Sequence, residues 1–198
     1  MEPIILASGS LRRQEYFKLL GLPFNIMPSM LDETPRAGVS PKDYTEDMAV
    51  RKINKIIDQL RGRIPHWICG ADTVISVDGE IFGKAQNRDT AKEMLLKLRG
   101  REHDVSTSVA LFNGRKQTID CRSVLSSVTF APLTDEELDW YLNTGEWQGV
   151  AGAYKIQGLG GCFITGIQGS YSAIVGLPMR EFYVMLLENG YPYLDENR

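Results

Sequence analysis

An apolar run of eleven residues, Trp67–Val77, constrains the fold of this 198-residue chain more than any other feature. A run of this length and composition is typical of a buried strand. Asp78-Gly79, a dipeptide favoured in type I′ turns, follows the run and precedes Glu80–Phe82. We therefore predict that the run lies inside a β-sheet and forms a hairpin with the short strand after it.

Helices and strands alternate in the first part of the chain, and hairpins follow. The predicted helices cover residues 14–20, 40–60, 88–98, 134–142 and 178–187, and the other strands cover 4–6, 103–112 and 117–130, the last two joined by a turn at Asn113-Gly114. Residues 23–35 are expected to be irregular, and the glycine-rich residues 149–170 to mix strands with tight turns. The pattern favours a single α/β domain over residues 1–198 with a mixed sheet.

Composition argues against several classes of protein. The net charge of −3 argues against a general nucleic-acid binder, which would normally be basic. Three widely spaced cysteines form no C-x-x-C pair, so they indicate neither a zinc site nor a disulfide framework but reduced thiols in a cytoplasm. No apolar stretch reaches the length that spans a bilayer, and the N-terminus does not resemble a signal peptide.

The first thirteen residues suit a bound phosphate. A short apolar strand over 4–6 leads into a turn with Ser8 and Ser10, and Arg12 and Arg13 open the helix that follows. Hydroxyls, free N–H groups, the positive end of a helix and two guanidinium groups all favour phosphate oxygens. The alternative is an ordinary turn with a solvated basic pair.

Asp72 is the best candidate for a catalytic group. It stands between Ala71 and Thr73 in the apolar run, where a carboxylate is costly unless it is paired, bound to a metal or used in chemistry. Ligands bind at strand ends in open α/β sheets, which favours a functional role. The alternative is an aspartate that caps or ends the strand.

Lysines near this strand could supply charge for a polyphosphate. Lys84 follows the 78–79 hairpin and can reach back toward Asp72, whereas Lys52 is expected to lie off the apolar face of the helix over 40–60. Each lysine alone would be an ordinary surface residue, but with the two arginines they supply four cations, which match a triphosphate. Lys55 and Lys155 are further candidates.

Two more segments bear on ligand binding. Asp32 and Glu33 lie in a Pro-bounded loop, and either acid could share a divalent cation such as Mg²⁺ with Asp72. The glycine-rich residues 152–161 contain neither a Walker nor a dinucleotide-binding motif. Gln157 in this stretch is expected to be exposed on a tight turn, where it could read the edge of a base.

Five segments together resemble the Maf family of nucleotide pyrophosphatases, in family order and over nearly the whole chain. They are LASGSLRR (6–13), GADTVI (70–75), GEIFGKA (79–85), AGAYKIQGLGG (151–161) and GSYSAIVGLP (169–178). Leu11 and Ala85 depart from the family pattern, which usually has proline at both positions.

The resemblance implies an elongated α/β fold with a deep cleft between two lobes. It also implies a cytoplasmic homodimer that hydrolyses a nucleoside triphosphate at the α-phosphate with a divalent cation, Mg²⁺ or Mn²⁺. The residues implied are Asp72 as proton acceptor, Ser8, Ser10, Arg13, Lys52 and Lys84 in the phosphate-binding cleft, and Glu33 in the same site, where it could hold the metal with Asp72.

Members of the family that prefer dTTP and UTP carry Arg, Thr and Gln at three positions that match Arg12, Thr73 and Gln157. A glutamine amide can pair with both O4 and N3–H of uracil or thymine, whereas a carboxylate suits the two donors of guanine. The resemblance therefore implies a dTTP/UTP pyrophosphatase. The alternatives are the same reaction on a modified or purine nucleotide such as 7-methyl-GTP, and a non-catalytic regulator of division.

Overall fold

The computed structural model describes residues 1–35, 38–62 and 65–194. Its strands are β1 (Ile4–Leu6), β2 (Phe24–Ile26), β3 (Trp67–Val77), β4 (Glu80–Phe82), β5 (Glu102–Asn113), β6 (Thr118–Phe130) and β7 (Ile164–Gln168). Its α-helices are α1 (Leu11–Leu19), α2 (Pro41–Gln59), α3 (Arg88–Leu98), α4 (Asp135–Asn143), α5 (Tyr171–Val175) and α6 (Met179–Asn189), and a 3₁₀ helix covers Leu159–Phe163.

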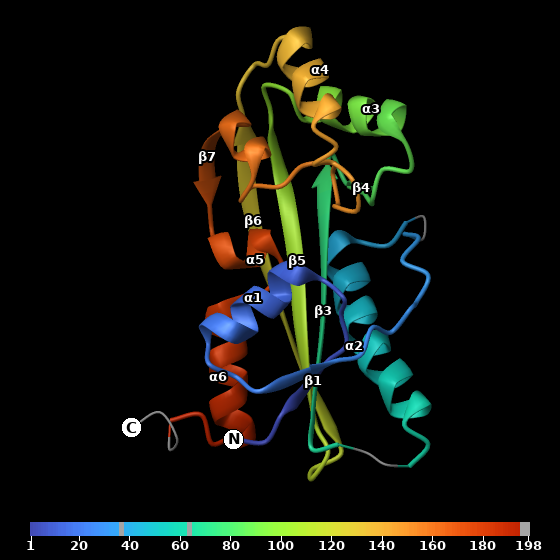
Figure 1. The fold of residues 1–198 in the computed structure, drawn as a ribbon, viewed down its shortest axis with the longest axis vertical. Coiled ribbons are helices and arrows are strands. Elements are labelled where there is room, and N and C mark those ends of the chain that lie inside the picture. Colours follow the sequence, from blue (N-terminus) through green and yellow to red (C-terminus); the bar gives the residue numbers. More distant parts are fainter. Residues whose placement is uncertain (36–37, 63–64, 195–198) are drawn as a thin grey trace.

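The strands form one mixed sheet, as the sequence predicts. Its order is β2-β1-β3-β5-β6-β7, with β4 as a further partner of β3. β1 pairs in parallel with β2 and β3, and every other pairing is antiparallel. The long strands β3, β5 and β6 run along most of an elongated molecule (Figure 1).

One edge of β3 is shared by two different strands. Because β5 pairs along nearly the whole of β3, β1 and β4 must both lie on the other edge, β1 at residues 68–69 and β4 at residues 75–77. Within the described part of the chain, residues 70–74 therefore have a strand partner on the β5 side only. Asp72 and Thr73 lie in this interval, so the sheet is open at two of the predicted site residues.

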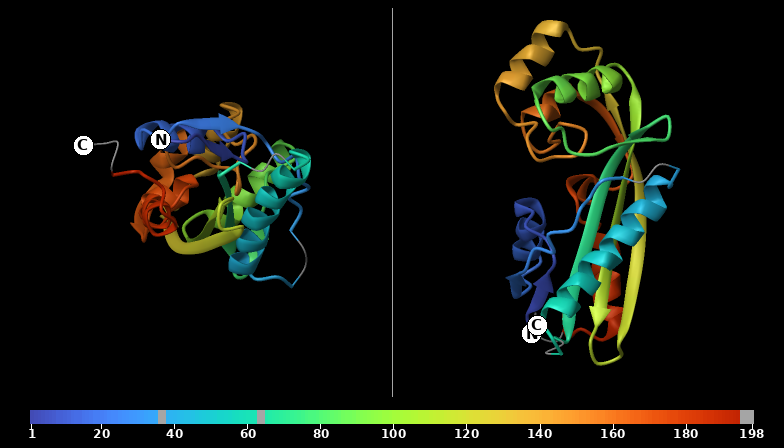
Figure 2. Two further views of the ribbon diagram at one scale, coloured as in Figure 1. Left: turned by 90° about the horizontal axis from the view of Figure 1, so that it is seen from below. Right: turned by 90° about the vertical axis from the view of Figure 1, so that its right-hand side faces the viewer.

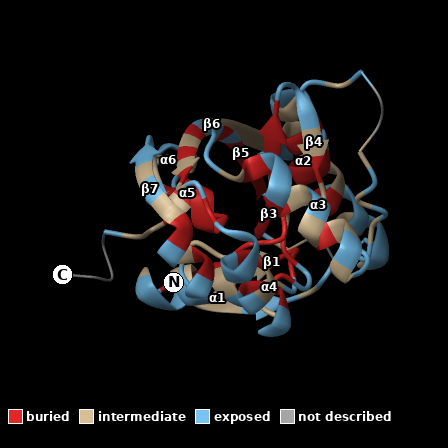
Figure 3. Cartoon of the chain, turned by 90° about the horizontal axis from the view of Figure 1, so that it is seen from above, coloured by how far each residue is buried: buried red, intermediate tan, exposed pale blue. Residues whose placement is uncertain are grey.

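Helices cover the sheet differently along its length. α2 packs on one face of the lower half, and α1 and α6 cover the other face (Figures 1 and 2). α3 and α4 pack together at the opposite end, over a separate apolar cluster. Seen from above, buried residues concentrate along β3 and β5, and the outer faces of the helices are exposed (Figure 3). No described helix is both long and apolar enough to cross a membrane.

Capping residues in the sequence predicted the starts of two helices correctly. Ser40 accepts a hydrogen bond from the backbone N–H of Asp43, and Thr134 and Glu137 form a complete capping box. The hairpin after β3 has positive φ at both Asp78 and Gly79, as a type I′ turn requires.

The structure differs from the sequence-based expectations at several elements. Residues 23–35 contain β2, a short strand at the sheet edge whose residues are largely exposed, and 171–175 form α5, which is too short to show a helical period. The turn expected around Asn113-Gly114 lies one residue further along, over residues 114–117, because β5 and β6 pair up to Asn113 and Thr118.

A further difference concerns α1, which begins at Leu11 and not at residue 14, since the N–H of Gln14 bonds to the carbonyl of Ser10 at 3.2 Å. Leu11 thus occupies the first helical position, where proline is common but not required, and its side chain is exposed.

A buried histidine lies in the core beneath α3 and α4. His103 is 3% exposed, packs edge-on against Phe130 and lies 2.8 Å from the hydroxyl of Tyr154 through Nε2, whereas Nδ1 has no hydrogen-bond partner among the described residues. Burial lowers the pKa of His103 to about 4. The folded protein therefore holds this imidazole neutral at pH values where the unfolded chain would protonate it.

We expect the free energy of unfolding to fall as pH drops from about 6.5 to 4, because only the unfolded state takes up the proton. His103 contributes up to about 3 kcal/mol of this loss, at about 1.4 kcal/mol per pH unit. Denaturant titrations of His103→Phe should show a flatter pH dependence in this window. His66→Gln, which alters an exposed histidine, is the control, and equal slopes for wild type and His103→Phe would contradict the assignment.

Candidate active site

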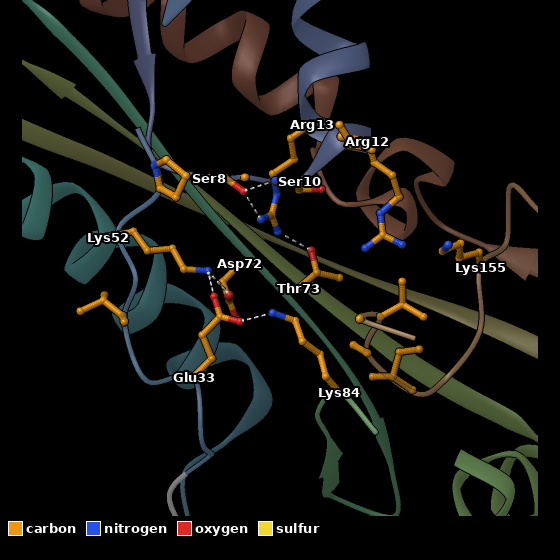
Figure 4. A pocket seen from close by; sticks show the side chains of 18 of the residues that line it. Ser8, Ser10, Arg12, Arg13, Glu33, Lys52, Asp72, Thr73, Lys84 and Lys155 are labelled. Atoms are coloured by element: carbon orange, nitrogen blue, oxygen red, sulfur yellow. Dashed lines mark hydrogen bonds and ion pairs between the residues drawn. The ribbon is translucent and has the colours of Figure 1, made fainter. Parts of the chain in front are cut away.

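A cavity of about 1050 Å³ lies at the open edge of β3. Its walls come from the loop between β1 and α1, the loop over residues 28–35, β3 itself, and the stretch after α4 (Figure 4). All of the predicted site residues line it: Ser8, Ser10, Arg12, Arg13, Glu33, Lys52, Asp72, Thr73, Lys84 and Gln157. Lys155 also lines this cavity, whereas Lys55 is exposed on α2 and does not.

Asp72 and Thr73 point to opposite faces of the sheet, as neighbours on a strand must. Asp72 faces α2, where Lys52 lies, and Thr73 faces α1, where Arg13 lies. Both side chains still reach one cavity because no strand closes this part of the edge of β3. The cavity therefore takes functional groups from both layers of helices.

Lys52 is buried at the centre of a charged cluster, which corrects the expectation that it lies off the packed face of its helix. It is 3% exposed, and its Nζ lies 2.6 Å from Asp72 Oδ1 and 2.8 Å from Glu33 Oε1. Nζ also donates to the carbonyl of Ala71 at 3.3 Å, a group on the unpaired interval of β3. All three ammonium protons thus have acceptors, which burial of the charge requires.

Gly70 lets α2 approach β3 closely enough for this contact. A Cβ at this position would lie 2.2 Å from the backbone carbonyl oxygen of Ala49, so a side chain would force the helix away. Lys52 lies three residues beyond Ala49 on the same face of α2. The missing side chain at Gly70 therefore sets the distance between the lysine and Asp72.

Burial and the nearby positive charges shift the pKa values of Asp72 and Glu33 in opposite directions. Burial raises the pKa of Asp72, and the nearby charges of Lys52 and Arg13 only partly oppose this effect. For Glu33, burial is outweighed by Lys52 and Lys84, which lower its pKa to about 2. Asp72 is therefore the more basic carboxylate of the two.

Glu33 joins the two lysines. Its Oε2 accepts from Lys84 Nζ at 2.6 Å, and its backbone carbonyl accepts from the hydroxyl of Tyr44 at 2.5 Å. An isolated antiparallel bridge joins Lys84 to Ala151, so the segment with this lysine contacts the loop after α4. The geometry thus brings lysines from two separate chain segments to one carboxylate.

Arg13 is buried and linked to three parts of the fold. Its Nε donates to the carbonyl of Gly176 at 2.9 Å, Nη1 donates to Ser8 Oγ at 3.0 Å, and Nη2 donates to Thr73 Oγ1 at 3.3 Å. Ser8 Oγ also accepts from the N–H of Ser10 at 3.2 Å. Three of the five guanidinium N–H groups have protein partners, which leaves two for a ligand.

Arg12 and Gln157 border the other end of the cavity. Both also line a smaller neighbouring hollow, and Arg12 lies on the same side as Lys155 (Figure 4). The loop that carries Gln157 is held by Glu146, whose carboxylate accepts from the N–H groups of Leu159 and Gly160, both at 3.0 Å.

Two carboxylates in the cavity suit a divalent cation shared with a substrate. Asp72 and Glu33 both lie within 2.8 Å of the same Nζ, and Oδ2 of Asp72 accepts no hydrogen bond within the described residues. Mg²⁺ is typically held by one or two carboxylates together with substrate phosphates. Among the described residues, no three His, Cys, Asp or Glu side chains form a group able to hold a metal ion without a substrate.

Comparison with known proteins agrees with the motifs. Residues 3–189 match the profile of the family described as Maf-like protein. The chain belongs to the Maf family. A relative from Symbiobacterium thermophilum, named dTTP/UTP pyrophosphatase, is 41% identical over 97% of this Maf chain and 96% of its own.

Two further Maf relatives carry the same name. The protein from Escherichia coli O157:H7 is 41% identical over 94% of this chain and 92% of its own. That from Pelotomaculum thermopropionicum is 38% identical over 98% of this chain and 100% of its own. The resemblance to the Maf family expected from the five segments is therefore confirmed.

Two residues that shape the site were missed in the sequence. Glu146 follows α4 in a polar segment and Thr107 lies inside an alternating strand, so neither differs from an ordinary surface or strand residue. The pairing of β3 with β5 sets Thr107 opposite Thr73, to which its hydroxyl donates at 3.0 Å.

We expect Lys52→Met to lower the free energy of unfolding by about 3 kcal/mol, because it leaves a buried carboxylate without its cation. The double variant Lys52→Met/Asp72→Asn should recover more than half of that loss, since the charge left behind is removed as well. Chemical denaturation at neutral pH measures both values. Equal stability of the single and double variants would show that the pair is not coupled.

Proposed function

We propose that this Maf protein hydrolyses dTTP and UTP at the α-phosphate, releasing the nucleoside monophosphate and pyrophosphate. The observation that carries the proposal is a buried carboxylate, Asp72, held beside Lys52 in a cavity lined by further arginines and lysines. The family match and the relatives named dTTP/UTP pyrophosphatase support both the reaction and the substrates.

Asp72 is proposed to accept a proton from the attacking water. Its raised pKa makes it a stronger base than an exposed aspartate, and Oδ2 is free of hydrogen bonds from the described residues. Lys52 holds Oδ1, so the carboxylate has one oxygen fixed and the other available.

The cations are proposed to stabilise charge on the phosphates. Arg13 and Lys84 approach the cavity from opposite sides (Figure 4), and Ser8 and Ser10 add hydroxyls next to the N-terminus of α1. Fixed donors aimed at the phosphates favour departure of pyrophosphate without a covalent intermediate.

Arg12, Thr73 and Gln157 are proposed to select the base. Arg12 and Gln157 also border the neighbouring hollow, Thr73 follows Asp72 on β3, and the apolar side chains of Ile75, Val105 and Ile174 line the same cavity. This arrangement suits a flat ring with polar edges.

A divalent cation, Mg²⁺ or Mn²⁺, is proposed as cofactor, held by Asp72 and Glu33 together with substrate phosphates. When bound, it would neutralise phosphate charge and favour deprotonation of water. The homodimer, the cytoplasmic location and the absence of nucleic-acid or membrane partners stay predictions from the sequence.

We expect Asp72→Asn to reduce pyrophosphate release from dTTP by at least about a thousandfold, because the amide cannot accept the proton. The thermal unfolding midpoint should stay close to that of wild type, since the amide retains the shape of the side chain. A variant at Lys55, which is exposed outside the cavity, serves as the matched control. Wild-type rates for Asp72→Asn would refute this mechanism.

A panel of nucleoside triphosphates, each tested with and without Mg²⁺ or Mn²⁺, tests the substrate assignment. dTTP and UTP should be hydrolysed fastest and only with metal, and Gln157→Glu should lower their kcat/KM about tenfold because a carboxylate cannot donate to O4. Faster turnover of 7-methyl-GTP would favour the purine alternative. Binding of dTTP without pyrophosphate release under any metal would favour the non-catalytic regulator.

A further inference from the structure

The glycine-rich stretch over residues 152–161 is built around one carboxylate. Glu146, which follows α4, accepts hydrogen bonds from the backbone N–H groups of Leu159 and Gly160, both at 3.0 Å. Backbone N–H groups of glycine-rich loops commonly bind phosphate. Here a side chain of the protein itself occupies these two donors, so this part of the stretch serves the fold and not a substrate phosphate.

Tyr141 links the same carboxylate to the start of the turn that follows. Its hydroxyl donates to Glu146 Oε1 at 3.2 Å and accepts from the backbone N–H of Lys155 at 3.3 Å. Tyr141 lies in α4 and is fully buried, so the core fixes its ring. Glu146 thus anchors the chain at Lys155, through the tyrosine, and again at residues 159–160.

Gln157 lies at the tip of the turn between these two anchors. The N–H of Gly158 donates to the carbonyl of Lys155 at 3.2 Å, which closes a turn with Ile156 and Gln157 as its central residues. Gln157 is exposed and lines the cavity, and its side chain has no hydrogen-bond partner among the described residues. The backbone of the turn therefore decides where this amide lies before a ligand binds.

The neighbouring glycines fit closely around the carboxylate. A Cβ at Gly158 would lie 2.3 Å from Glu146 Oε2, and a Cβ at Gly160 would lie 2.8 Å from the carbonyl oxygen of Lys155. A side chain at either position would displace a group that holds the turn. Close packing about Glu146 thus explains why this stretch needs glycine.

We propose that Glu146 is a positioning residue that fixes the turn over residues 155–158 and so aims the Gln157 amide at the base. This inference rests on the proposed function, in which Gln157 selects the base. Glu146 does not line the cavity, and within the described residues its hydrogen bonds reach none of the groups proposed to bind phosphate. It therefore acts on recognition of the base, through its neighbour.

The contacts require a carboxylate and not merely a side chain of this size. Three donors, from Tyr141, Leu159 and Gly160, converge on two oxygens, and a carboxylate offers only acceptors. An amide of the same shape must turn its NH₂ group toward at least one of these donors. Glu146→Gln therefore breaks at least one contact while it leaves the space filled.

The test is steady-state hydrolysis of UTP by Glu146→Gln, measured by pyrophosphate release. A turn that no longer fixes Gln157 weakens the contacts with the base in the ground state and the transition state alike, so KM rises while kcat stays near the wild-type value. We expect kcat/KM to fall about tenfold, the usual effect of losing one well-placed polar pair. Glu136→Gln, the same change at an exposed position of α4, is the matched control and should leave both constants unaltered.

A double-mutant cycle tests whether Glu146 acts through Gln157. In a Gln157→Ala background, Glu146→Gln should change kcat/KM for UTP by less than about twofold, because the amide that it positions is gone. Inorganic triphosphate, which carries the phosphates without a base, should inhibit Glu146→Gln at least as strongly as wild type. A merely structural role predicts an equal loss of kcat/KM in both backgrounds and weaker inhibition by triphosphate, and either result overturns the proposal.

Gly158→Ala is a second variant that alters neither Glu146 nor Gln157. The φ of −120° at Gly158 is open to any residue, but the new Cβ would meet the Glu146 carboxylate and displace it. If Glu146→Gln does not fold, Gly158→Ala must give the same rise in KM.

The outcomes separate this inference from the proposed function. Wild-type protein that hydrolyses UTP while Glu146→Gln and Gly158→Ala keep its KM overturns this inference alone. Wild-type protein that releases no pyrophosphate from UTP or dTTP overturns the proposed function, and this inference with it.

Discussion

The unpaired interval of β3 is the constraint on which the rest of the structure depends. Backbone groups left without a strand partner inside a protein must be satisfied in another way. Here β1 and β4 leave residues 70–74 open, and Lys52 donates to a carbonyl of that interval. The same lysine binds Asp72, so the group that satisfies the open edge also holds the carboxylate proposed to be catalytic.

The charged cluster gives its two carboxylates different pKa values, which suits the proposed chemistry. Lys52 contacts both carboxylates, and Glu33 also pairs with Lys84. Asp72 is buried and has one oxygen without a hydrogen bond from the described residues. Burial and pairing thus push the pKa values of the two acids apart. Separation of two neighbouring pKa values is how a site assigns one acid to proton transfer and another to binding.

Motifs with a purely local cause were predicted well. The Asp78-Gly79 hairpin, the capping box at Thr134 and the helix over Arg88–Leu98 depend on residues within a few positions of each other, and the structure confirms all three. β2 and α5 were missed because each is short and lies where packing, not periodicity, decides the conformation. Lys52 was misplaced because a helical pattern cannot show that a buried lysine has acceptors from two distant segments.

By itself, the sequence determined the element types, the mixed sheet and the set of residues that line one cavity, because apolar periodicity, turn dipeptides and family motifs are properties of short segments. Only the tertiary structure decided how those residues divide their tasks. The hydrogen bonds that hold Arg13 depend on Thr73 and Gly176, and the basicity of Asp72 depends on burial under α2. Both are set by neighbours distant in sequence, since these hydrogen bonds and desolvation arise only when the chain is packed.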